Sequence, residues 1–338
     1  KQIINADYAE NRSITGAGVK VAVFDRGVNI DHEEFNGRTI NPDSRNVRSG
    51  FTVLTEEEHQ FTAQNKYRTF DIGPQEDENG HGTAVTSLII GEEGGIAPDV
   101  DLLHIDITRL ASNGQPSLFV DSDVTIGMID ELADSGFDFF SASNGGTFNI
   151  QYRQRNPVFD PENPFIDDGE FVETPFWRKL ATRDVGLIVG AGNDAEDLTE
   201  KLNTSRFSGE NSTSTFAVKD DVVAPQYLWV GAVTNNGELA DFSNTPGSDT
   251  DIQARFIMAP GKDIVMPSHL NDESLVRQFG TSFSTPIVTG AAALVKSQHP
   301  TLSNSSVLTV LLESADRSFE GYDAKLHGQG ILDIEAAL

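Results

Sequence analysis

The segment from Gly280 to Leu294, GTSFSTPIVTGAAAL, constrains this chain most strongly, because glycine and hydroxyl residues run directly into a stretch of small residues. Apolar positions then recur at the spacing of one helix face, at Ile287, Val288, Ala291, Ala292 and Val295. Pro286 is tolerated in a first helical turn, so we predict a helix that begins at or just after Ser282. The first N–H groups of a helix lack acceptors and carry partial positive charge. Ser282 is therefore a candidate nucleophile.

An alternative for Ser282 is an ordinary helix cap, since serine and threonine are favoured at helix starts. A serine hydroxyl is a weak nucleophile until a base takes its proton, and the base needs a group that orients it. The choice between cap and nucleophile depends on whether the rest of the chain supplies a histidine, a carboxylate and a donor for an oxyanion.

The composition is that of a globular protein and excludes several classes of partner. Of the 338 residues, 38% are hydrophobic and 22% are charged, and the formal net charge is −28. Such an acidic surface repels nucleic acid and anionic membranes, and it suits salty or extracellular surroundings or simply good solvation. We expect no nucleic-acid partner, no signal peptide and no membrane insertion of this segment. Cysteine is absent, which excludes disulfides and thiolate metal sites.

Two polar residues stand at the ends of predicted buried elements. The run from Lys20 to Asp25, KVAVFD, predicts a buried strand that ends in an acid. In open α/β sheets, functional sites lie beyond the carboxyl ends of the strands, so Asp25 is a candidate functional residue. The alternative is an aspartate that only forms a turn. His81 lies between two glycines in NGHGTAVTSLIIG, at the start of a predicted helix. His104, inside the strand sequence LLHIDI, is better explained as a core histidine.

Strands and helices continue to alternate, which predicts an α/β fold. Further strands are expected at 101–107, 137–142, 185–191, 227–233 and 256–259, and helices at 121–135, 174–182 and 303–315. The strand at 137–142 runs into Ser143, Asn144 and Gly145, whose backbone groups can pair with an extended peptide. The strand at 185–191 runs into Gly192 and Asn193. Asn193 either takes a left-handed turn or directs its amide N–H at an oxyanion.

The chain is predicted to form one domain over residues 1–338, since no repeat, low-complexity tract or linker composition divides it. The expected architecture is a single-domain, three-layer αβα fold with a mostly parallel central sheet. Three polar intervals without clear periodicity, near 36–78, 148–173 and 194–226, are expected as surface insertions.

An acid, a histidine, an asparagine and a serine now follow one another along the chain, with the triad order Asp, His, Ser that is found in subtilisin. The motifs VAVFDRG, NGHGTAV, GAGN and GTSFSTPIVTGAAAL, around these four residues, resemble the subtilisin-like serine protease family. GGIAPDVDLLHIDI, SASNGG, VGAVTNNGELADFSN and GQGILDIEAAL resemble further segments of its catalytic domain. The resemblance therefore extends from about Gly16 to the last residue.

The resemblance implies a serine endopeptidase that hydrolyses proteins through an acyl-enzyme. In this family Ser282 would attack the scissile carbonyl, His81 would accept its proton and Asp25 would orient the histidine. Asn193 and the backbone N–H of Ser282 would hold the oxyanion. Residues of the substrate-binding region would be Ser143, Asn144, Gly145, Gly192 and Asp194.

Several residues depart from the usual family pattern. Arg26 stands where a small hydroxyl residue is usual beside the acid, and Phe283 replaces the methionine common after the nucleophile. Asn144 occupies an often aliphatic position of the pocket wall. With Asp194 and the acids that follow it, Glu196 and Asp197, this predicts acceptance of basic or polar side chains before the scissile bond.

The family also implies partners and a location. We expect protein and peptide substrates, the protein's own propeptide as folding aid and inhibitor, and a monomer. No cofactor is required for the chemistry, and no residue is assigned as a metal ligand. The family often binds structural calcium, but 90–96, IGEEGGI, looks too short for its usual calcium loop. GTSFSTP with the long insertions also resembles the passenger protease of a bacterial autotransporter, which implies a secreted or cell-surface protein.

Three other functions compete with this interpretation. A catalytically silent protease fold can act as a surface binding or adhesion module. An α/β-hydrolase esterase would need a GxSxG elbow around Ser282 and a different triad order, and both are absent. A dinucleotide-binding protein would need GxGxxG after the first strand, which is also absent.

Overall fold

The computed structural model describes residues 1–25, 27–29, 31–38, 40, 45–46, 80–106, 109–110, 116–117, 134–143, 173–200, 214–268 and 271–338. Within these ranges seven strands form a central sheet in the order β2-β3-β1-β6-β7-β8-β9. All neighbouring pairs of this sheet are parallel. The strands are β1 (Lys20–Asp25), β2 (Arg45–Asn46), β3 (Asp101–Asp106), β6 (Phe139–Ala142), β7 (Gly186–Gly190), β8 (Tyr227–Val233) and β9 (Phe256–Pro260).

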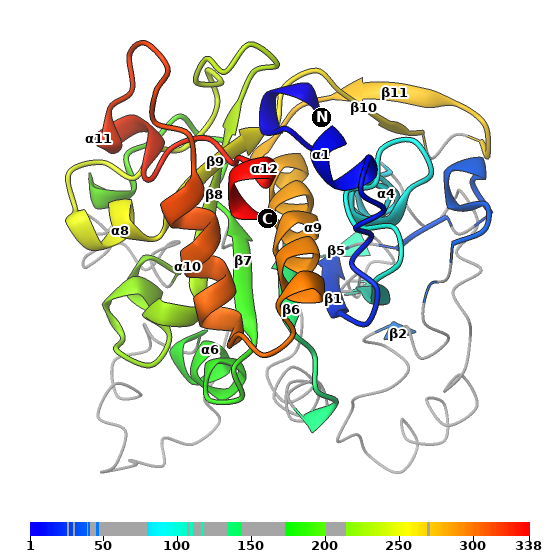
Figure 1. The fold of residues 1–338 in the computed structure, drawn as a ribbon, viewed down its shortest axis with the longest axis horizontal. Coiled ribbons are helices and arrows are strands. Elements are labelled where there is room, and N and C mark those ends of the chain that lie inside the picture. Colours follow the sequence, from blue (N-terminus) through cyan, green and yellow to red (C-terminus); the bar gives the residue numbers. More distant parts are fainter. Residues whose placement is uncertain are drawn as a thin grey trace.

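Helices cover both faces of this sheet, as Figure 1 shows for the front layer. The long helices are α4 (His81–Ile90), α6 (Glu173–Ala181), α9 (Thr281–Gln298) and α10 (Asn304–Ser314). The helix α9 packs against five strands, β1 and β6 to β9, and lies between α4 and α10. The helix α6 lies on the opposite face, where its Trp177 meets Phe140 of β6 with ring centroids 5.9 Å apart. The predicted three-layer αβα fold with a parallel sheet is therefore confirmed.

Shorter elements complete the described fold. They are η1 (Gln2–Ile4), α1 (Asp7–Glu10), η2 (Glu33–Phe35), β4 (Arg109–Leu110), β5 (Pro116–Ser117), η4 (Ser214–Lys219), η5 (Ala224–Gln226), α8 (Thr250–Ala254), β10 (Ile264–Pro267), β11 (Leu275–Gln278), α11 (Ala324–His327) and α12 (Ile334–Ala337). The strands β10 and β11 form an antiparallel hairpin apart from the main sheet. Among the described residues, no helix combines the length and the apolar character needed to cross a bilayer.

The strands are continuous apolar runs because both faces of the sheet are covered. Each residue of β6, β7, β8 and β9 is buried. On the α6 face an aromatic row crosses the sheet, with centroid distances of 5.0, 5.9, 5.7 and 5.2 Å between successive rings. Its members are Phe24, Phe140, Trp177, Tyr227 and Trp229. This row fixes the sheet from below while α9 covers it from above.

The helix α9 is the centre of the other layer. All residues from Thr281 to Val295 are buried, which small side chains permit. A side chain at Gly290 would place its Cβ 2.6 Å from that of Ile96, so only glycine allows this approach. The prediction that Pro286 lies in the first helical turn is wrong, because the helix begins at Thr281 and the proline is its sixth residue. Its ring therefore removes an N–H donor from the second turn, not from the first.

The order of the strands places a crevice beside β1. The chain leaves β1, passes through α4 and adds β3 on one side, and it later adds β6 and the following strands on the other side. Such a reversal separates the loops at the carboxyl ends of the strands and creates the usual binding site of open α/β sheets. Asp25 ends β1 and Ser143 follows β6, so both residues lie at this edge.

The regular elements match most sequence expectations within a few residues. The helix predicted at 121–135 lies outside the described residues except at its end, as do most of the intervals 36–78 and 148–173. Among the described residues of the interval 194–226, Leu198, Ala217, Val218 and Val223 belong to the core. The β10–β11 hairpin is a feature that the sequence analysis did not predict.

One buried histidine makes the stability of this fold depend on pH. His327 is 5% exposed, and its ring meets that of Phe319 at 5.1 Å. Burial lowers the pKa of His327 below its ordinary value of 6.5, although Asp323 acts in the opposite direction. The unfolded chain therefore binds the proton at a higher pH than the folded chain does. The stabilisation by neutral His327 is complete above 6.5 and declines as the pH falls below it.

We predict that the free energy of unfolding declines as the pH is lowered from about 7 to about 5, and that His327→Gln reduces this slope because glutamine takes up no proton. Urea unfolding at a series of pH values measures both proteins. An identical slope in the variant would contradict the role of His327.

Candidate active site

Asp25 and His81 are brought together by the ends of β1 and α4. The Asp25 carboxyl group has no solvent exposure, and its Oδ1 lies 2.6 Å from Nδ1 of His81. His81 is the first residue of α4, and its side chain remains 23% exposed. A hydrogen bond donated by Nδ1 leaves Nε2 of the neutral ring as a proton acceptor. The pair thus presents a basic nitrogen toward solvent with the carboxylate behind it.

Ser282 lies in the first turn of α9, near the same edge of the sheet. It is 8% exposed, and its hydroxyl donates to the carbonyl of Ser143 at 2.8 Å. Backbone N–H groups of a first turn have no acceptor within the helix. Ser282 therefore combines a hydroxyl at the mouth of the crevice with an N–H available for an anion.

Asn193 is held by the residue that precedes Ser282. The Oδ1 atom of Asn193 accepts from the backbone N–H of Thr281 at 2.8 Å and from its hydroxyl at 3.1 Å. These bonds orient the carboxamide, so its NH₂ group faces away from Thr281. The alternative of a left-handed turn at Asn193 is wrong, because the positive φ angles fall on Gly192, at 104°, and Ala195, at 55°.

A buried asparagine that the sequence analysis did not single out clamps the loop of Asn193. Asn244 is 1% exposed. Its Nδ2 donates to the carbonyl of Ala191 at 2.9 Å, and its Oδ1 accepts from the N–H groups of Asp194 and Glu196 at 3.1 and 2.8 Å. Its backbone N–H donates to the carbonyl of Gly192 at 3.0 Å. A Cβ on Gly192 would come within 2.5 Å of Nδ2 of Asn244, so glycine is required there.

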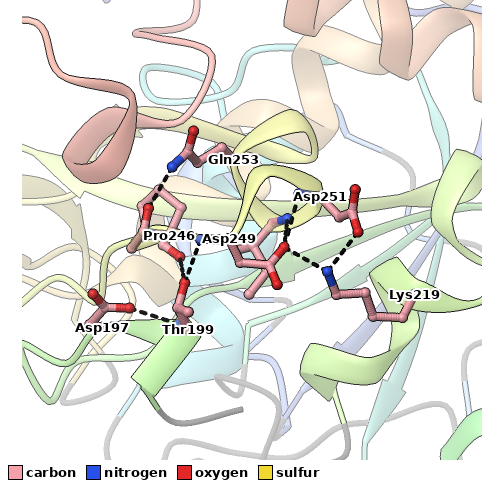
Figure 2. Close-up of polar contacts among 9 residues, drawn as sticks. Asp197, Thr199, Lys219, Pro246, Asp249, Asp251 and Gln253 are labelled. Atoms are coloured by element: carbon pink, nitrogen blue, oxygen red, sulfur yellow. Dashed lines mark hydrogen bonds and ion pairs between the residues drawn. The ribbon is translucent and has the colours of Figure 1, made fainter. Parts of the chain in front are cut away.

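The segment after Asn244 is fixed by a second polar network (Figure 2). The hydroxyl of Thr199 donates to the carbonyl of Pro246 at 2.9 Å and accepts from the N–H of Asp249 at 2.8 Å. Lys219 donates to Asp249 at 2.7 Å and to Asp251 at 2.6 Å. Burial acts to raise the pKa of Asp249, but the hydrogen bonds from Lys219 and the backbone outweigh it and lower the pKa. An ionised Asp249 thus helps to hold the segment that follows Asn244, the residue that clamps the Asn193 loop.

A cavity of about 240 Å³ opens at this edge. His81, Asn193 and Ser282 line it together with apolar residues of α4, α9 and the β10–β11 hairpin. Phe283 forms part of its wall, with its ring 5.6 Å from that of His81. The arrangement can present a hydroxyl, a basic nitrogen and an amide donor to one bound group.

A family model for the subtilase family matches residues 16–331. The chain belongs to the subtilase family. As a subtilase, the protein is a serine endopeptidase, a hydrolase that cleaves peptide bonds.

Curated and solved relatives agree with this membership. The chain is 26% identical to Subtilisin E of Bacillus subtilis, over 99% of this chain and 69% of the relative. It is also 26% identical to Subtilisin DY of Bacillus licheniformis, over 99% and 96% of the two chains. The fold is similar to that of the prenylagaramide maturation protease PagA, with a TM-score of 0.63, 23% identity and coverage of 98% and 96%. It is also similar to that of a cold-adapted subtilisin-like serine proteinase, with a TM-score of 0.59, 22% identity and coverage of 94% and 89%.

Two of the candidate binding residues, Asn144 and Gly145, lie outside the described residues. Ser143 and Gly192 flank the crevice from β6 and β7. His104 is a buried core histidine, as expected, with Nδ1 3.1 Å from the hydroxyl of Thr86.

The three acids behind Asn193 separate into two groups in this subtilase. Asp194 and Glu196 are exposed. Asp197 instead accepts from the N–H groups of Thr199 and Glu200, at 2.7 and 3.2 Å. Its charge is thus used within the fold, whereas Asp194 and Glu196 are solvent-exposed beside Asn193.

The loop after α4, which looked too short for calcium, is held by a buried carboxylate. Oε1 of Glu34 accepts from the N–H groups of Glu93 and Gly94 at 3.0 and 2.8 Å. In the part of the chain that the structure describes, no group of three His, Asp or Glu side chains is arranged to hold a metal ion. Calcium ligands therefore remain unassigned.

We predict that Asn244→Ala lowers kcat about ten- to a hundred-fold with little effect on KM, because the loop that carries Asn193 loses its clamp. Loss of these bonds in a buried site also lowers the free energy of unfolding by about 1–3 kcal/mol. Steady-state kinetics on a peptide substrate and urea unfolding measure the two effects. Asn235→Ala, at an exposed position, is the matched control. An unchanged kcat in the destabilised variant would show that Asn244 has a structural role only.

Proposed function

We propose that this subtilase hydrolyses peptide bonds in proteins through a triad of Asp25, His81 and Ser282 and an acyl-enzyme intermediate. The observation that carries the proposal is the 2.6 Å contact between the buried Asp25 carboxylate and Nδ1 of His81, at a cavity that Ser282 also lines. A histidine held in this way has the tautomer and orientation of a general base.

In the first step Ser282 Oγ attacks the scissile carbonyl carbon, and its proton passes to Nε2 of His81. In the resting arrangement this proton is donated to the carbonyl of Ser143, so the hydroxyl must reorient before attack. Hydrogen bonds of catalytic groups often tighten only when substrate is bound. Asp25 stabilises the imidazolium that forms and does not itself take the proton.

The tetrahedral intermediate places negative charge on the former carbonyl oxygen. Asn193 Nδ2 and the N–H of Ser282 are the donors we assign to this oxygen. The bonds from Thr281 support the assignment, because they occupy Oδ1 of Asn193 and turn its NH₂ group toward the cavity. Donors that are oriented before the reaction stabilise developing charge without reorganisation.

The intermediate collapses when His81 gives its proton to the leaving amine, so the C–N bond breaks and an ester with Ser282 remains. Water then attacks the ester while His81 takes a proton from it, and the acid product leaves with Ser282 restored. Subtilases need no cofactor for this chemistry, since every proton moves between protein groups, substrate and water.

The remaining properties of the protein are proposed from the same family. Ser143, Asn144 and Gly145 would pair with the substrate backbone before the scissile bond, and Gly192 would line the pocket of the last residue of that segment. We further propose a single catalytic domain, an inhibitory propeptide, and secretion or display at a bacterial cell surface. A hydrophobic core that includes both Ile4 and Ala337 supports the single domain.

A fluorescent fluorophosphonate tests the triad directly. We predict that it labels Ser282, as peptide mapping would show, and that the labelled protein loses its cleavage of a denatured protein. Ser282→Ala should fold normally and lose at least about 10³-fold in kcat. Labelling of a different residue, or full activity in Ser282→Ala, would overturn the triad. A folded parent protein that takes no label would favour the silent binding module.

The exposed acids Asp194 and Glu196 generate a prediction for specificity. We expect acceptance of Lys or Arg before the scissile bond, and an about 1.4- to five-fold lower kcat/KM for these substrates in Asp194→Asn, since exposed charge pairs contribute about 0.2–1 kcal/mol. Peptides with Leu at the same position are the control and should not respond. A substrate library with preference for large apolar residues alone would contradict this expectation.

A further inference from the structure

Exposed apolar side chains gather beside the candidate active site. Within the described ranges, large hydrophobic side chains are exposed at Val222, Val265, Leu275, Val276, Phe279 and Leu326. Four of these lie on the β10–β11 hairpin or directly after it, and Phe279 reaches 65% exposure. A clustered apolar surface is more often a contact site than scattered apolar residues are.

The hairpin is held firmly in place by its tip. Figure 1 shows it crossing above α4 toward the segment that follows β1. There Asn29 Nδ2 donates to Asp272 Oδ1 at 2.8 Å, and the N–H of Glu33 donates to the carbonyl of Asp272 at 2.8 Å. Nε2 of His32 lies 3.1 Å from the carbonyl of Ser274. The hairpin is therefore a fixed wall of the cavity.

One face of this wall points into the cavity. Met266 and Val276 are directly paired in the register of the hairpin, and both line the cavity with Phe279. Pro267, Ala84 of α4 and the buried ring of Phe283 add to the apolar lining, and Gln278 adds a polar side chain. Val265 is paired with Arg277 one position along the register and does not line the cavity, so it belongs to the opposite face.

The position of His81 determines which part of a substrate this cavity receives. His81 must protonate the leaving amine, so the segment after the scissile bond departs on the side of the histidine. The cavity lies against Gly80, His81 and Ala84, whereas the end of β6 at Ser143 does not line it. The cavity is thus on the side of the leaving segment.

We propose that this subtilase selects substrates with an aromatic or large aliphatic residue immediately after the scissile bond, and that Phe279 and Val276 determine this choice. The inference rests on the proposed function. One side of the cavity is lined by the catalytic candidates His81, Asn193 and Ser282, and the hairpin side is lined by the apolar Met266, Val276 and Phe279, which favours burial of such a side chain there. A hydrophobic pocket of this kind discriminates by about ten- to two-hundred-fold between substrates that fill it and substrates that do not.

Acyl transfer measures this selection separately from the first half of the reaction. The enzyme is acylated with a peptide ester, and amino acid amides then compete with water for the acyl-enzyme. We expect phenylalaninamide and leucinamide to capture it at least about ten-fold more efficiently than glycinamide or aspartic acid α-amide. Each ratio is referred to hydrolysis of the same acyl-enzyme.

Three variants localise the effect. Phe279→Ser and Val276→Ser replace exposed side chains and should reduce the advantage of phenylalaninamide about three-fold or more. Val265→Ser removes a similar exposed side chain from the outer face of the same hairpin and should leave the ratio unchanged. The two cavity variants report independently, so poor folding of one leaves the other as the test.

The outcomes separate this proposal from the proposed function. Absence of ester turnover by the folded parent overturns the proposed function and this inference with it. Normal ester turnover with equal capture of all amides, or an unchanged preference in both cavity variants, overturns the inference alone. A capture ratio that varies with enzyme concentration would mean that a second copy of the chain covers the hairpin, which also overturns it.

Discussion

Burial of a carboxylate at the end of β1 is the constraint on which the rest of the site depends. Asp25 is 0% exposed, and a buried charge is tolerated only when close polar partners replace the lost water. His81 supplies such a partner at 2.6 Å. This requires α4 to begin at His81, and Gly80, with φ of 70°, allows the chain to turn into the helix there. The helix is buried from Gly82 to Ile90, so core packing fixes the histidine.

The packing of α9 is what brings Ser282 to the same place. A helix that is buried over fifteen consecutive positions, from 281 to 295, must carry small side chains wherever another element approaches closely. Two positions meet this requirement. Gly290 lies directly against Ile96, and the hydroxyl of Thr289 lies 3.0 Å from that of Ser141. The same burial sets the first turn of α9 at the carboxyl edge of the sheet. The stability of the core and the geometry of the site are therefore two results of one packing arrangement.

Packed elements leave a clear pattern in the sequence, whereas contacts between loops do not, and this explains which parts of the fold and the site could be predicted. Buried parallel strands are continuous apolar runs, so β1 and β8 were predictable to the residue, and glycine-flanked His81 marked the start of α4. The hairpin β10–β11 was not predictable, because IVMP and LVRQ are short and mostly exposed on one strand. Asn244 was missed because its partners, the backbone groups of residues 191–196, are close only in the fold. Pro286 misled the helix boundary, since a proline in a second turn is rare.

The two walls of the cavity are held mainly by different networks, and this has a consequence for how specificity can change. The Asn193 loop is fixed by Thr281 and Asn244, whereas the hairpin is fixed by contacts of Asp272 and Ser274 with the segment after β1. One contact joins the two walls, because the ring of Phe279 lies 5.4 Å from that of Phe242, whose carbonyl accepts from the N–H of Ala195 in the Asn193 loop. Sites without shared partners respond to substitution nearly independently. Variation at Val276 can therefore change the residues accepted after the scissile bond while the groups that stabilise the oxyanion keep their positions, whereas variation at Phe279 also reaches the Asn193 loop.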